Sequence, residues 1–164
     1  MSERILKALM QLFAIVAKVN LNDDEIRADQ SSRLIVKLFL QQDLPSELID
    51  KYLKIFDEFI KERHSSTRKK DGTRKRTSVN SVKVLRICTQ INEELEQRQK
   101  VIVLIRILEF IFADPEHSEK ELEFAATVAD TFNIESKEYE EIFHFVESAS
   151  KKIFEQENQL IICS

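Results

Sequence analysis

Asp114 and Glu121 are the residues whose type and spacing best suit binding chemistry in this 164-residue chain. They lie on either side of an expected turn between two helices. At such a turn, carbonyl oxygens ending one helix and carboxylates opening the next can gather around a hard cation such as calcium or magnesium. A second interpretation needs no metal, because Ser118 and Glu121 match a capping box and Asp114 can accept hydrogen bonds from loop amides. Both interpretations remain open at this point.

A second constellation is the Glu-x-x-His spacing of Glu141 and His144, which is typical of carboxylate-bridged di-iron helical bundles. Such a site needs another Glu-x-x-His motif and two further inward-facing glutamates. The nearest match, at residues 114–117, falls in an expected turn. A metal enzyme built on Glu141 and His144 is therefore one hypothesis for the chain, but its set of ligands is incomplete.

Catalytic groups are otherwise hard to find. Cys88 falls on the apolar stripe of its expected helix, where a thiol usually serves as a small core residue. The chain has a single glycine, Gly72, which excludes glycine-rich phosphate-binding loops. The histidines His64, His117 and His144 are scattered, with no serine or cysteine in evident partnership. We expect a protein that is not an enzyme.

The composition favours an all-α fold. The chain is 43% hydrophobic and 33% charged, with one glycine and two prolines, too few for the closely spaced turns of an all-β protein. Two cysteines give no disulfide framework, and the N-terminus has neither a signal peptide nor a membrane-spanning pattern. These features predict a cytoplasmic location.

Apolar residues recur at three- and four-residue steps through most of the chain, which predicts a bundle of about seven helices. We expect one domain over residues 1–155, divided into two halves. The expected helices cover residues 3–18, 22–41 with an Asn22 cap, 45–64, 82–95, 101–112, 118–132 and a segment from Ser136.

Between the halves, residues 65–81 are almost wholly polar and predict a mobile basic loop. Residues 63–86 carry nine Lys or Arg against one acid, whereas residues 87–164 carry seven against seventeen acids. Segment 63–76 could therefore bind nucleic acid or an anionic membrane through charge alone. No aromatic residue interleaves with it to stack bases, so a solvated linker is the other interpretation.

The tail, residues 156–164, departs from the helical pattern. Its end, Gln159 to Ser164, is an apolar run with strand propensity. One interpretation is the first strand of a following domain. The alternative is a hydrophobic tail that folds back on the bundle.

The two halves also resemble each other. Residues 17–25 align without gaps with residues 113–121, sharing an alanine at the end of a helix, a capping residue and a glutamate. Tyr52 with Phe56 is echoed by Tyr139 with Phe143. This internal similarity predicts two pseudo-symmetric halves.

These motifs resemble the tellurite-resistance TerB-like family, whose signature is Ala-Asp-Gly, a Ser cap and then Glu, in each half of a helical bundle. The second half matches at Ala113, Asp114, Ser118 and Glu121, with Pro115 in place of the family glycine. The first half matches the pattern at three positions, Ala17, Asn22 and Glu25. It has Lys18 in place of the family aspartate.

Segments 4–14 and 87–94 look more closely like TerB-like domains that precede the ATP-binding regions of ABC transporters. The resemblance implies metal-linked roles for Asp114 and Glu121 and an accessory or regulatory function. It implies a protein partner or a covalently attached ATPase domain. It implies no specific nucleic acid, and contact with a membrane only indirectly, through a transporter.

Overall fold

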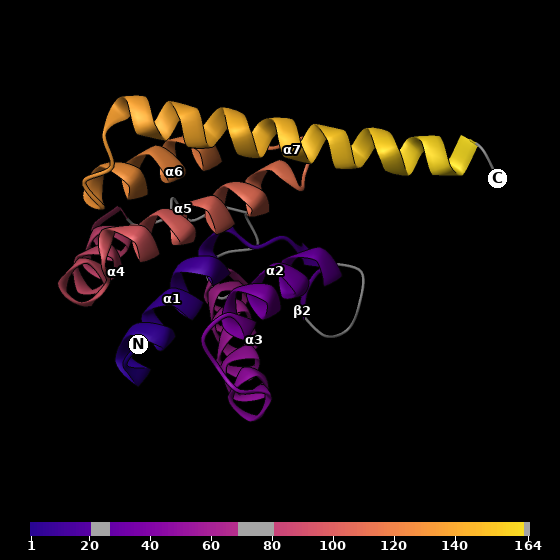
Figure 1. Cartoon of the computed structure of the whole chain (residues 1–164). Coiled ribbons are helices and arrows are strands. Elements are labelled where there is room, and N and C mark those ends of the chain that lie inside the picture. The colour runs from indigo at the N-terminus through magenta and orange to yellow at the C-terminus, as the bar shows by residue number, and fades with distance from the viewer. Residues whose placement is uncertain (21–26, 69–80, 163–164) are drawn as a thin grey trace.

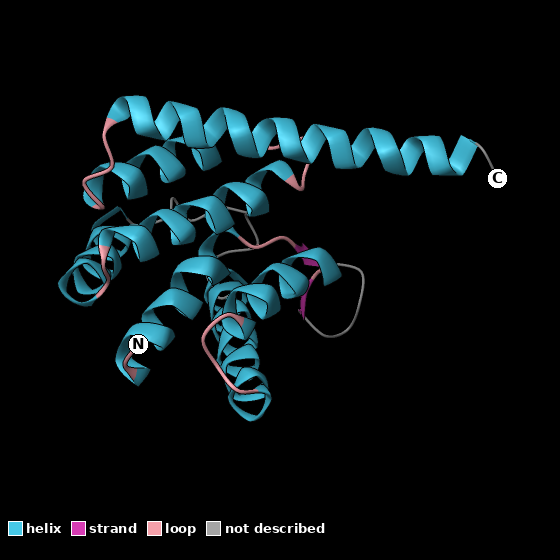
Figure 2. Cartoon of the chain, in the orientation of Figure 1, coloured by secondary structure: helices cyan, strands magenta, loops and turns pink. Residues whose placement is uncertain are grey.

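The computed structural model of the chain describes residues 1–20, 27–68 and 81–162, with backbone alone at 20, 65–68, 81, 154 and 157–162. These residues form seven helices and one short antiparallel ladder, which confirms the all-α prediction (Figures 1 and 2). The elements are α1 (Glu3–Val16), β1 (Val19–Asn20), β2 (Arg27–Ala28), α2 (Gln30–Gln41), α3 (Ser46–Arg68), α4 (Ser81–Glu94), α5 (Gln97–Phe112), α6 (Glu119–Thr131) and α7 (Ser136–Ile162).

A single hydrophobic core runs through both halves of the chain. Phe13 of α1 lies at its centre and is fully buried. Its ring meets that of Phe39 in α2 edge-on at 5.2 Å between centroids and lies 5.5 Å from that of Phe110 in α5. Aromatic contacts of this kind bury large apolar areas, so the two halves are joined by shared packing.

The helices pack in a similar order in each half. In the first half α1 packs against α3, and in the second α5 packs against α7. Helix α1 also contacts α4 and α5, so it touches both halves. Figure 1 shows α7 lying across α5 and α6 and running past the end of α5. This arrangement leaves the turn between α5 and α6 close to the segment that follows α1.

The start of the second helix differs from the prediction. Asn22 lies outside the described residues, and residues 27–28 pair with 19–20 as strands, so a helix running unbroken from Asn22 is wrong. Helix α2 begins at Gln30, where Asp29 is the N-cap and its Oδ1 accepts a 2.8 Å hydrogen bond from the Ser32 amide. The sequence pattern predicts only Asn22 as the cap, because a short-range motif does not show where the β1–β2 ladder ends and the helix begins.

Helix α3 continues to Arg68, four residues beyond the expected end. Residues 65–68 of the predicted loop are therefore helical. The rest of that loop up to residue 80 lies outside the described residues, as does most of the basic segment 63–76.

Helix α7 has 27 residues and runs through Ile162, so a strand at the C-terminal tail is wrong. The helical repeat that places Ile142 and Val146 against the bundle continues to Ile153, two turns after Val146. A Glu147–Lys151 ion pair, one turn apart at 3.7 Å, supports the same helix. Despite this length, no described helix is apolar enough to cross a bilayer.

A lysine and carboxylate junction as the candidate functional site

The turn between α5 and α6 is built by the predicted capping box. Ser118 is the N-cap of α6, and its Oγ accepts a hydrogen bond from the Glu121 amide at 3.3 Å. In return the Ser118 amide donates to Glu121 Oε2 at 2.9 Å. The exchange satisfies two amides that the start of a helix would otherwise leave unpaired. It also fixes the Glu121 side chain, leaving Oε1 free to face another group.

Asp114 is held in the same turn by the backbone. Its Oδ1 accepts a hydrogen bond from the Glu116 amide at 2.9 Å, which confirms the predicted bond to a loop amide. This amide bond, together with the ammonium of Lys18, holds the pKa of Asp114 below its ordinary value. The Asp114 carbonyl oxygen lies 3.1 Å from Nδ1 of His117. The Asp114 side chain is therefore a fixed, ionised carboxylate.

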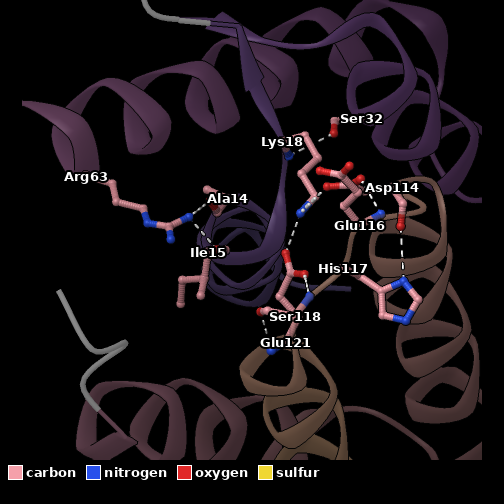
Figure 3. A network of polar contacts seen from close by, with 10 residues as sticks. All are labelled: Ala14, Ile15, Lys18, Ser32, Arg63, Asp114, Glu116, His117, Ser118 and Glu121. Atoms are coloured by element: carbon pink, nitrogen blue, oxygen red, sulfur yellow. Dashed lines mark hydrogen bonds and ion pairs between the residues drawn. The ribbon is translucent and has the colours of Figure 1, made fainter. Parts of the chain in front are cut away.

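Lys18 brings the two carboxylates together, as Figure 3 shows. Its Nζ lies 2.5 Å from Glu121 Oε1 and 3.1 Å from Asp114 Oδ2. All three side chains are partly buried: the exposed fractions are 29% for Lys18, 23% for Glu121 and 32% for Asp114. Burial works to lower the pKa of Lys18, but the hydrogen bonds and charges of the two carboxylates outweigh it and raise that pKa.

The backbone of Lys18 is fixed to the first half of the chain. Its amide donates to Oγ of Ser32, a buried residue in α2, at 3.2 Å. Its carbonyl accepts a 3.0 Å hydrogen bond from the Asp29 amide. Because the Lys18 side chain bonds to the turn between α5 and α6, this residue links the two halves through polar contacts at both ends.

Arg63 provides a second polar link, between α3 and the end of α1 (Figure 3). Its Nη1 donates to the carbonyl oxygens of Ala14, at 3.1 Å, and Ile15. A cation is favourable there, because the last carbonyls of a helix lack partners and carry its negative dipole end. Burial lowers the pKa of Arg63, and the charge of Glu121 opposes that shift. Arg63 thus belongs to the folded bundle.

For the predicted cation site, the structure brings Asp114 and Glu121 to the same point, and Lys18 Nζ lies there. Among the described residues, no group of three or more His, Cys, Asp or Glu side chains is placed to hold a metal ion. Calcium or magnesium at Asp114 and Glu121 stays a prediction, in which the metal and the ammonium compete. Sequence reasoning missed the reach of the Lys18 side chain and the inward position of Arg63.

The other candidate residues lie elsewhere. Glu141 and His144 are both exposed on α7, where the His144 ring lies against Phe143 with centroids 5.7 Å apart. Cys88 is fully buried in the core, as its apolar stripe predicts. Burial raises the pKa of its thiol to about 12. A thiol of this kind is not ionised near neutral pH and is a poor nucleophile.

Comparison of the chain with protein-family models, with curated proteins and with solved structures found no match.

Proposed function

We propose that this chain is a TerB-like accessory domain that acts by binding a protein partner and does not catalyse a reaction. The proposed partner is the ATP-binding domain of a transporter, either covalently attached or separate. The resemblance at Ala113, Asp114, Ser118 and Glu121 supports the family. In this proposal the domain is cytoplasmic and meets the membrane only through the transporter.

The observation that carries the proposal is the exposure of large apolar side chains on α7. Phe145 is 70% exposed and Ile153 is 59% exposed. Large apolar side chains left in water on one element often mark a surface that a partner covers. Ile153 also continues, two turns after Val146, the row of α7 residues that packs against the bundle. These features support α7 as the partner-binding surface.

A photocrosslinking residue placed singly at positions 145 and 153 tests this surface in cells. The matched control is position 61, because Lys61 is exposed on α3 and, among the described residues, no large apolar side chain is exposed in that part of the helix. We expect crosslinks to an ATP-binding transporter component from positions 145 and 153, identified by mass spectrometry, and none from 61. Equal crosslinking from all three positions, or none to any ATP-binding component, would contradict the proposal.

The rival function is an adaptor for nucleic acid or anionic membranes through the basic segment 63–76. Its first residue, Arg63, contacts α1, and residues 69–76 lie outside the described residues. We expect little binding to DNA or anionic vesicles near physiological salt, and loss of any binding when Arg74, Lys75 and Arg76 become Ser. Tight, salt-resistant binding to a defined nucleic acid would favour the rival.

A further inference from the structure

We propose that the Lys18 ammonium occupies the position between Asp114 and Glu121 that a divalent cation would otherwise fill. These three residues are called the junction below. The inference rests on the contacts of Lys18 and is independent of the proposed partner. It implies that calcium or magnesium binds the two carboxylates well only after the ammonium is removed or displaced.

The geometry leaves room for one cation. Calcium lies 2.3–2.6 Å from its oxygen ligands, and Lys18 Nζ already lies 2.5 Å from Glu121 Oε1 and 3.1 Å from Asp114 Oδ2. A metal bound by the same two oxygens would overlap the nitrogen. The ammonium and the metal are therefore mutually exclusive.

The surroundings favour the ammonium. The Lys18 backbone is held by hydrogen bonds to Ser32 and Asp29, which fixes the point from which its side chain extends toward the two carboxylates. The charge of Glu121 also acts on Arg63, so a second cation of the chain lies within electrostatic reach of this carboxylate. A divalent ion entering beside Lys18 and Arg63 would be repelled by both.

The contacts of Lys18 differ from those of an ordinary surface ion pair. Lys151 pairs with Glu147 on the same helix, but its side chain is 73% exposed and the pair lies within one turn. Exposed ion pairs of this kind contribute little to the free energy of unfolding. Lys18, by contrast, joins two carboxylates from the other half of the chain and is 29% exposed. Lys151→Met is therefore a matched control for the loss of one lysine charge.

The test is calcium binding by isothermal titration calorimetry and thermal melting in calcium chloride, against potassium chloride of equal ionic strength. The full chain is compared with Lys18→Met, Lys18→Gln, Lys18→Arg and Lys151→Met. We expect the neutral Lys18 variants to bind calcium with a Kd about tenfold lower than that of the starting protein. Their melting temperature should rise with calcium, because a ligand that binds only the folded state stabilises it. Lys18→Arg and Lys151→Met should behave like the starting protein.

The double variant Lys18→Met/Asp114→Asn shows whether any gain arises at the junction, and it should lose the calcium response. Circular dichroism establishes whether each variant is folded. If Lys18→Met does not fold, Lys18→Gln takes its place as the neutral variant. Calcium binding by the starting protein as tight as that of Lys18→Met would overturn the proposal. So would folded neutral variants without any gain, or a gain that survives Asp114→Asn.

Discussion

The guanidinium of Arg63 in α3 donates a hydrogen bond to the carbonyl oxygen of Ala14 at the end of α1, 49 residues earlier in the chain. Helix α1 has no basic residue in its own last turn, so Arg63 supplies the positive charge from outside. The contact joins the C-terminal part of α3 to the end of α1.

Replacing Arg63 with methionine should lower the free energy of unfolding by about 1.5–3 kcal/mol, the usual contribution of hydrogen bonds to a charged group. Urea denaturation measures the loss. Lys61→Met is the matched control, since Lys61 is exposed in the same helix, and it should change stability by less than about 0.5 kcal/mol. Equal effects of the two substitutions would mean that Arg63 does not cap α1.

Replacing Phe13 with alanine should lower the free energy of unfolding by about 3–5 kcal/mol. The ring is fully buried against Phe39 and Phe110, and its removal leaves a cavity. The control is Phe145→Ala on α7, where the ring is 70% exposed. That change should cost far less. Comparable losses in urea denaturation would contradict the described core.

The pKa of Asp114 lies below its ordinary value of 3.8 in the folded chain. Its carboxylate therefore contributes stability above that value, and the contribution is lost as the pH falls through the folded pKa. Asp114→Asn should be less stable than the starting protein by about 0.5–1 kcal/mol at pH 7. In urea denaturation at decreasing pH, the difference between the two proteins should shrink once the pH falls below 3.8 and vanish below the folded pKa of Asp114. A difference that stays constant with pH would rule out an ionised, stabilising Asp114.

Cys88 should react slowly with thiol reagents in the folded protein, since burial raises its pKa to about 12. In a Cys163→Ser background, we expect labelling at pH 8 about a hundredfold slower than in urea, because the reagent must wait for local unfolding. Cys88→Ser in the same background shows the reagent's blank rate. Fast labelling without urea would place the thiol outside the core.

The parts of this molecule that sequence predicts are those fixed by neighbouring residues. Ser118 and Glu121 are three positions apart, and their capping box follows from local helix geometry alone. Cys88 is buried because its helix presents one apolar side, which periodicity shows. The number of helices follows for the same reason.

Other features depend on residues far apart in the chain. Lys18 and Glu121 are 103 positions apart, and no local pattern indicates that their side chains meet. The choice of Asp29 over Asn22 as the cap of α2 depends on the β1–β2 ladder beside it. At the tail, an apolar run with strand propensity is helical as the continuation of α7. Strand propensity is only a weak guide to the structure of so short a run.

The central claim is that Lys18 and Glu121 stabilise one another across the two halves, and a double-mutant cycle tests it most directly. Glu121→Gln removes the charge but keeps an oxygen for the capping bond from the Ser118 amide, while Lys18→Met keeps most of the apolar stem. From urea denaturation of the two single variants, the double variant and the starting protein, we predict a coupling free energy of about 1 kcal/mol, falling with added salt. Losses that add to within about 0.3 kcal/mol would contradict the claim.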